Sequence, residues 1–195
     1  MTRERRDSDL LYRAWYWLRH RGRPPSRLGD AVGQVEHEAS MGLLAAAAGV
    51  RVPSVLLVRS FGNGAGLLVQ QRVAGHDLTN LDGQRLDQAR LAAIWQQVAG
   101  LRKARIAHHD LGLESVMVDT QEQVWLVDFD RAETAATDLL LDRDLTTLLA
   151  AVDGVADPAL VRATAEQTLG QDTVGRVLPQ AAATPAAAAH ATQGS

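Results

Sequence analysis

The spacing of apolar residues over the first fifty positions predicts two helices. The first covers Asp7–His20, and the second covers Leu28–Ala48 and ends at Gly49, because glycine is common just after a helix. The apolar stripe expected to be buried on the second helix consists of Val32, Val35, Ala39, Leu43 and Ala46. A loop containing glycine and proline is expected to join the two helices.

Two short apolar runs, Ser54–Val58 and Gly66–Val73, follow and predict a β-hairpin. The segment between them, residues 61–65, contains two glycines. A phosphate-binding glycine loop usually leads from a strand into a helix, so a plain turn between two strands is the favoured interpretation. Ala74–Asp77 is interpreted as a polar break after the hairpin.

The second half of the chain begins with a predicted helix at Leu86–Arg105, and we expect this helix to pack at the centre of the fold. Its apolar face consists of Leu91, Ile94, Trp95, Val98 and Leu101. The runs Val116–Val118 and Val124–Val127 predict a second hairpin. Further helices are expected at 136–152, 158–169 and 171–179. This order of helices and hairpins predicts an α+β fold.

Composition narrows the class of protein. With 195 residues, of which 46% are hydrophobic and 22% charged, the chain fits a globular domain. A net charge of -3 gives no reason to expect binding to nucleic acid, and the lack of cysteine excludes disulfides and thiolate metal sites. The chain contains no apolar run of about 18 residues, the length needed to span a bilayer. Residues 181–195 are low in complexity and predicted to be disordered.

Basic residues are distributed unevenly along the chain. Arginines crowd residues 1–27, which we interpret as a basic helix and loop, whereas Lys103 is the one lysine. A solvated helix face is the simpler explanation of the arginines, and contact with membrane phosphates or with a partner is the alternative.

The stretch Ile106–Arg131 contains a polar loop, the second hairpin and an acidic turn. Because the two strands of a hairpin run in opposite directions, Asp110 and Asp128 are expected at the same end of it. Two carboxylates placed in this way can divide the work of phosphoryl transfer. One accepts a proton from a hydroxyl group, and the other holds a divalent cation against phosphates.

These residues resemble the motifs of the protein-kinase-like superfamily. The tetrapeptide at 108–111, His-His-Asp-Leu, resembles the His-Arg-Asp-Leu catalytic loop, and the tripeptide at 128–130, Asp-Phe-Asp, resembles the Asp-Phe-Gly metal motif. The resemblance implies that Asp110 and His108 are catalytic and that Asp128 and Ser115 bind metal. It also implies ATP and Mg²⁺ as cofactors.

Other segments fit the small-molecule and lipopolysaccharide kinase branch of this superfamily. By resemblance, Glu38 is the helix glutamate that pairs with a lysine, and Gln71 and Val73 lie in the hinge that contacts the nucleotide. Asp144 resembles the aspartate that braces the catalytic loop. The resemblance implies a kinase-like domain at 28–180, with a truncated N-terminal lobe at 28–75 and a mostly helical C-terminal lobe at 76–180.

A narrower resemblance concerns the segments V-E-H-E-A-S-M-G-L-L-A-A-A-A-G-V-R-V-P, R-K-A-R-I-A-H-H-D-L and V-W-L-V-D-F-D. They are similar to the soluble kinase-like domain of bacterial flippase-like or lysylphosphatidylglycerol-synthase-like membrane proteins. This similarity implies a membrane domain or membrane protein as partner. It also implies a cytoplasmic location, at the inner face of the membrane.

Three interpretations of function follow. The main one is a pseudokinase or truncated regulatory module, because residues 1–30 contain no lysine, Ser115 stands where the family has asparagine, and Asp130 replaces glycine. The second is an active phosphotransferase that uses ATP to phosphorylate a small-molecule or lipid hydroxyl. The third is a fragment without independent function.

Overall fold

The computed structural model describes residues 31–61, 64–81 and 86–183. The predicted helix at Asp7–His20 and the basic segment 1–27 lie outside the described residues, as do residues 184–195 of the predicted disordered tail. The remaining elements form an α+β fold with two small antiparallel sheets, which confirms the predicted fold class.

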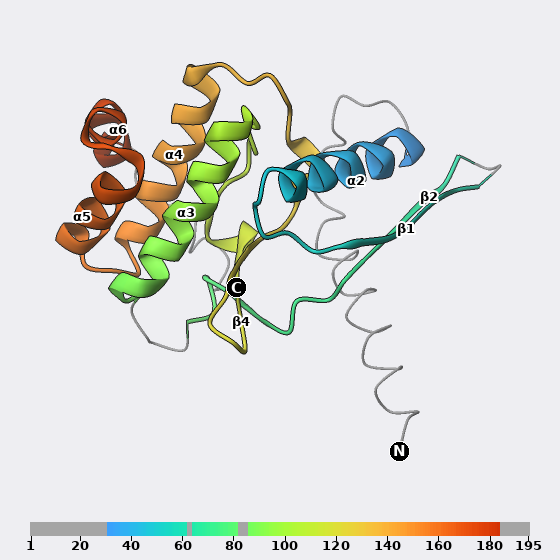
Figure 1. Cartoon of the computed structure of the whole chain (residues 1–195), viewed down its shortest axis with the longest axis horizontal. Helices are drawn as coiled ribbons and strands as arrows, with labels where there is room; N and C mark the ends of the chain where they lie inside the picture. Colours follow the sequence, from blue (N-terminus) through green and yellow to red (C-terminus); the bar gives the residue numbers. More distant parts are fainter. Residues whose placement is uncertain (1–30, 62–63, 82–85, 184–195) are drawn as a thin grey trace, which may run out of the picture.

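One side of the molecule consists of a long helix and a hairpin (Figure 1). Helix α2 (Ala31–Ala47) packs along strands β1 (Val55–Ser60) and β2 (Gly66–Gln70), which pair antiparallel. Gly49 follows the helix with a φ of 85°, a conformation that favours glycine. The helix, its end and the first hairpin are therefore confirmed. At the end of the hairpin, the Phe61 N–H donates to the Ala65 carbonyl oxygen at 2.9 Å.

The buried face of α2 differs from the predicted stripe. The buried residues are Ala39, Met41, Gly42 and Ala45, whereas Leu43 is 57% exposed and Ala46 is also exposed. The helix is rich in alanine, so apolar residues occur on every side and their spacing does not identify the packed face. Three of the four buried residues are small, and on this side α2 lies close to β2 and to the turn after β5.

The second sheet has the strand order β3–β4–β5, with all neighbours antiparallel. Strands β4 (Val116–Asp119) and β5 (Val124–Leu126) form the predicted second hairpin. Strand β3 (Gly75–Asp77) was wrongly predicted as a polar break. A Cβ atom at Gly75 would lie 1.9 Å from the Val118 carbonyl oxygen, so this close pairing requires glycine, a residue that normally argues against a strand.

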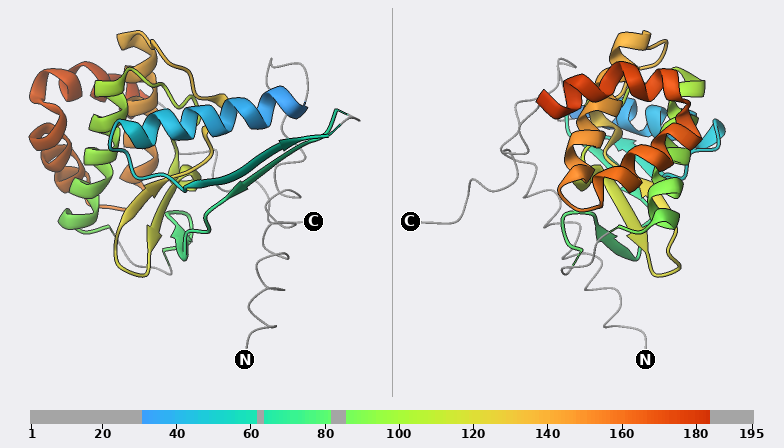
Figure 2. Two further views of the ribbon diagram at one scale, coloured as in Figure 1. Left: turned by 45° about the vertical axis from the view of Figure 1, so that its right-hand side comes forward. Right: turned by 90° about the vertical axis from the view of Figure 1, so that its left-hand side faces the viewer.

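The other side of the molecule is helical. It consists of α3 (Gln88–Ala104), α4 (Asp138–Asp153), α5 (Pro158–Leu169) and α6 (Gln171–Ala183). Helix α5 packs on α3, and α6 packs on α4 and α5 (Figure 2). All four helices were predicted, but α6 continues to residue 183, beyond the predicted start of disorder at residue 181. Among the described helices, none is both long and apolar enough to cross a bilayer.

Helix α3 lies at the centre of the core, as predicted. All five residues of its predicted apolar face are buried, and the helix packs against both α5 and β5. Trp95 is fully buried, and its indole N–H donates to the Thr164 hydroxyl oxygen on α5 at 3.0 Å. This bond satisfies the polar atom of the largest side chain in the core, so α3 and α5 can pack without an unpaired donor.

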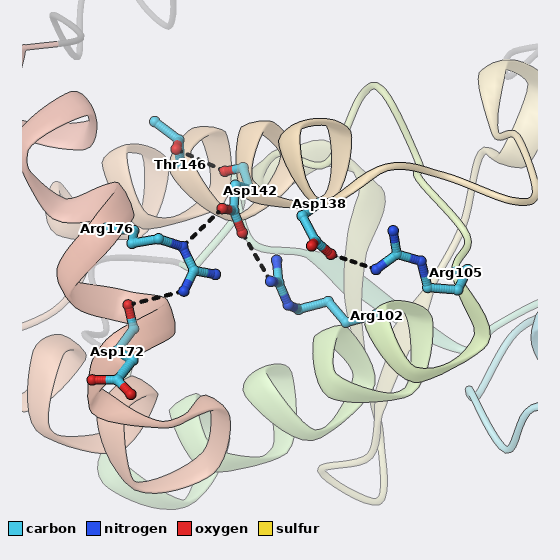
Figure 3. A network of polar contacts seen from close by, with 7 residues as sticks. All are labelled: Arg102, Arg105, Asp138, Asp142, Thr146, Asp172 and Arg176. Atoms are coloured by element: carbon cyan, nitrogen blue, oxygen red, sulfur yellow. Dashed lines mark hydrogen bonds and ion pairs between the residues drawn. The ribbon is translucent and has the colours of Figure 1, made fainter.

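A network of ion pairs joins α3, α4 and α6 (Figure 3). Asp142 on α4 accepts from Arg102 on α3 at 2.8 Å and from Arg176 on α6 at 3.3 Å. The side chains of Arg102 and Asp142 are each only 16% exposed. A second pair, Arg105 with Asp138, is open to water, since the Asp138 side chain is 76% exposed. The first pair should therefore contribute more to stability than the second.

Substituting Asp142→Ala is expected to lower the free energy of unfolding by about 2 kcal/mol, because Arg102 would keep its charge in a mostly buried position. Urea denaturation followed by tryptophan fluorescence measures the change. Asp138→Ala is the matched control, since it removes an exposed partner on the same helix and should leave the midpoint unchanged. Equal shifts for both variants would contradict this account.

Candidate active site

The polar loop after α3 is held in place by one buried carboxylate. Helix α3 ends at Arg105, which has a φ of 56° and turns the chain into the loop. Asp144 on α4 is buried and accepts the backbone N–H groups of His108 at 2.5 Å and His109 at 2.9 Å. Burial raises the pKa of Asp144, and the two N–H groups act in the opposite direction by favouring its charged form. The predicted brace is therefore present, and it orients the backbone just before Asp110.

His108 is fully buried, and burial lowers its pKa, so the ring is neutral. Its Nε2–H donates to the Val127 carbonyl oxygen at 2.9 Å, and its ring meets that of Phe129 edge-on. Within the described part of the chain, its Nδ1 atom has no hydrogen-bond partner. The buried His108 ring thus helps to position the loop through its bond to Val127. A catalytic role for His108 stays a prediction.

Val127 connects the polar loop that follows α3 to the acidic turn at residues 128–130. Its N–H donates to the Ser115 carbonyl oxygen at 3.0 Å, and its carbonyl accepts from His108. Both the N–H and the C=O group of Val127, the residue before Asp128, are therefore hydrogen-bonded to the loop that contains Asp110. Asp110 and Asp128 thus lie at the same end of the β4–β5 hairpin, as the strand directions predict.

Asp128 occupies a left-handed backbone conformation, with φ 69° and ψ 59°. Aspartate and asparagine tolerate this region better than most residues, although it remains unfavourable. Asp130, which replaces the family's glycine, lies instead in the 3₁₀ turn Phe129–Arg131. The unusual backbone angles of this turn therefore belong to Asp128 and not to the residue that replaces glycine.

The surroundings of the carboxyl groups near the acidic turn disfavour an unpaired negative charge, so these groups tend to bind either a proton or a cation. Burial, together with the charge of Asp130, raises the pKa of Asp128 to about 7. The same two causes raise the pKa of Glu38, on α2, to about 7. Carboxylate oxygens are the preferred ligands of Mg²⁺, and a cation among these groups would offset their repulsion. Within the described residues, no group of three or more His, Cys, Asp or Glu side chains is arranged to hold a metal ion. Metal binding by Asp128 therefore stays a prediction, in which phosphate oxygens would supply further ligands.

Ser115, the other predicted metal ligand, is buried at the end of the loop. Its hydroxyl donates to the Gly112 carbonyl oxygen and accepts from the Gly112 N–H, both at 3.0 Å. A hydroxyl oxygen has two lone pairs, so one remains for a cation if both bonds persist. Ser115 thus shapes the loop, and its binding of metal stays a prediction.

The predicted hinge residues lie at the opposite end of the β4–β5 hairpin. Gln71 is exposed and Val73 is buried, and both line a cavity of about 270 Å³ together with Asp119 and Trp125. Trp125 pairs directly with Met117, so the two side chains share one face of the sheet. This face extends from the cavity toward Asp128.

Two residues of the site were not anticipated. Glu133, after the acidic turn, pairs its backbone with Ala107, and its carboxylate lies 3.4 Å from His109 Nε2. His37 on α2 contacts the carbonyl oxygen of Ala132 at 2.7 Å. No motif marks these residues, because each acts through its position in the folded chain.

Comparison with known proteins gives relatives among sugar kinases. The 3-deoxy-D-manno-octulosonic acid kinase of Photobacterium profundum is 32% identical over 112 residues, which cover 53% of this chain and 46% of the relative. The enzyme of the same name from Vibrio parahaemolyticus serotype O3:K6 is 30% identical over 89 residues, covering 43% of this chain and 37% of the relative. The matched regions thus span less than half the length of these curated relatives.

Solved structures of WbdD share the fold. The monomeric form has a TM-score of 0.53 and 21% identity, with 77% of this chain and 37% of WbdD covered. A second structure, described as a bifunctional kinase-methyltransferase, has a TM-score of 0.51 and 19% identity over 88% of this chain and 41% of WbdD. These similarities confirm the kinase-like fold.

The sequence model of one family matches most of the chain. It is the Lipopolysaccharide kinase (Kdo/WaaP) family, and the match covers residues 46–169. This range includes β1, the loop with Asp110, the turn with Asp128 and helix α4 with Asp144, whereas Glu38 and His37 on α2 lie outside it. The chain therefore belongs to the lipopolysaccharide kinase (Kdo/WaaP) family, a branch of the protein-kinase-like superfamily.

Proposed function

We propose that this chain is an active phosphotransferase that transfers the terminal phosphoryl group of ATP to a sugar hydroxyl. The observation that carries the proposal is the pair of hydrogen bonds between the Val127 backbone and the loop that contains Asp110. These bonds keep Asp110 and Asp128 at one end of the hairpin. The proposed acceptor is a 3-deoxy-D-manno-octulosonic acid residue, since the curated relatives are named as kinases of that sugar.

In the proposed mechanism, Asp110 accepts the proton of the acceptor hydroxyl as the new bond to phosphorus forms. Asp144 keeps the loop in position through the two backbone N–H groups that it accepts. Asp128 would hold Mg²⁺, which, when bound, neutralises charge on the phosphates. The protein thus contributes mainly position and electrostatics, which dominate catalysis in this chemistry.

The nucleotide base is proposed to lie near Gln71 and Val73, on the sheet face that bears Met117 and Trp125. From there the phosphates would run along the hairpin toward Asp128. Strands rise about 3.3 Å per residue, so the distance from Asp119 to the loop end at Val116 is about 10 Å, a length that suits a nucleotide.

The pseudokinase interpretation is the weaker of the two, since the curated relatives that this chain resembles are named as kinases. Its main support was the lack of lysine in residues 1–30. An arginine from this segment can replace a lysine at phosphate, because guanidinium stays charged and binds two oxygens at once. The candidates are Arg13, Arg19, Arg21, Arg23 and Arg27.

ADP formation in the presence of Mg²⁺ and ATP tests the proposal. One acceptor is an oligosaccharide that ends in 3-deoxy-D-manno-octulosonic acid, and its control is the same oligosaccharide without that residue. We expect ADP formation to rise only with the first. Equal rates of ADP formation with both oligosaccharides would contradict the proposed acceptor. No ADP formation with either of them would favour the pseudokinase interpretation.

Membrane association is a second part of the proposal. The arginine-rich segment 1–27 would contact anionic lipid headgroups at the cytoplasmic face, or a membrane partner. Such a contact would bring the site close to a lipid-linked sugar.

A further inference from the structure

We infer that His37 is the positioning residue that holds α2, and with it Glu38, against the turn that follows Asp128. The inference deepens the proposed function and depends on it for the effect on catalysis. The contact itself can be tested without any activity.

The contact joins two parts of the chain that are 95 residues apart. His37 is half-buried, and its Nε2 atom lies 2.7 Å from the carbonyl oxygen of Ala132. A carbonyl oxygen only accepts, so the ring must donate through Nε2–H. Ala132 is almost fully buried, so losing this donor would leave its carbonyl oxygen poorly hydrated.

The acceptor segment is also bonded to the catalytic loop. The Ala132 N–H donates back to Phe129 at 3.2 Å, which closes the turn. The next residue, Glu133, exchanges two backbone hydrogen bonds with Ala107, at 2.8 and 2.9 Å. Residues 132 and 133 therefore connect α2 on one side to the catalytic loop on the other.

Glu38 depends on this contact because it follows His37 directly on α2. The same helix packs against the turn Phe129–Arg131, so the position of α2 sets where Glu38 lies relative to that turn. The His37–Ala132 bond fixes α2 against this turn, and it is made by the residue next to Glu38 on the same helix.

Two substitutions separate the hydrogen bond from the bulk of the side chain. His37→Ala removes the donor, and His37→Gln keeps an N–H donor on a chain of similar reach. Glu36→Ala is the control, because Glu36 is an exposed neighbour on α2. Hydrogen exchange followed by mass spectrometry reports on the amides of residues 129–133, and steady-state kinetics report kcat and the KM for the acceptor.

In His37→Ala we expect faster exchange at residues 129–133 and a kcat lowered by about tenfold or more, with the acceptor KM unchanged. His37→Gln should restore most of both. Unchanged exchange in His37→Ala would overturn the inference, as would faster exchange with an unchanged kcat. If the wild-type protein is inactive, the proposed function fails, and the exchange result alone decides whether His37 holds α2 to the turn.

Discussion

Replacing Asp110 with asparagine is expected to lower the rate of phosphoryl transfer by about a thousandfold, because a general base typically contributes a factor of this order. Asparagine has nearly the same shape but cannot accept the proton of the acceptor hydroxyl. The loop should keep its structure, since Asp144 binds the backbone of His108 and His109 and not the Asp110 side chain. Single-turnover transfer from ATP to the acceptor measures the effect.

Asp153→Asn is the control for this variant, because Asp153 is an exposed aspartate at the end of α4. It should transfer phosphate at the wild-type rate. ATP should protect Asp110→Asn against thermal unfolding as well as it protects the wild type, since the altered group acts on the acceptor. Transfer within a few-fold of wild type in Asp110→Asn would show that Asp110 is not the base.

Replacing Asp128 with asparagine is expected to lower transfer on the order of a thousandfold through loss of Mg²⁺, whose neutralisation of phosphate charge is worth several kcal/mol. Asparagine suits the left-handed backbone at this position, so the variant should fold. Alanine at this position would add backbone strain, so loss of metal binding could not be separated from loss of stability. The expected signature is that Mg²⁺ no longer increases the thermal protection given by ATP.

Ser115→Ala is the comparison for Asp128→Asn, since Ser115 is the other predicted metal ligand. Its hydroxyl is already bonded to Gly112, and a hydroxyl is a weaker ligand than a carboxylate. Its loss should change the Mg²⁺ dependence less than the loss of Asp128. A larger effect from Ser115→Ala would reverse the assignment of the main metal ligand.

Much of this fold could be predicted because its central parts have strong periodic patterns. The apolar face of α3 repeats at helical spacing and is buried along its whole length. The two-strand pattern from Val116 to Val127 predicted the hairpin, and the hairpin in turn predicted that Asp110 and Asp128 lie at one end.

Other features could not be predicted, because they depend on contacts between distant residues. Strand β3 is three residues long and polar, and only its pairing with β4 makes it a strand. The packed face of α2 is set by β2 and the acidic turn, since its alanines fit equally well on any side. The burial of His108 results from Phe129 and Val127, residues about twenty positions away.

The central claim is that this chain transfers phosphate to a sugar, and the fate of the labelled γ-phosphate of ATP tests it most directly. The full chain is incubated with labelled ATP, Mg²⁺ and an acceptor that ends in 3-deoxy-D-manno-octulosonic acid, and the products are separated. We predict that the label becomes covalently attached to the acceptor and that Asp110→Asn reduces this attachment to background. Label found only in ATP and inorganic phosphate, at equal levels for wild type and Asp110→Asn, would contradict the account.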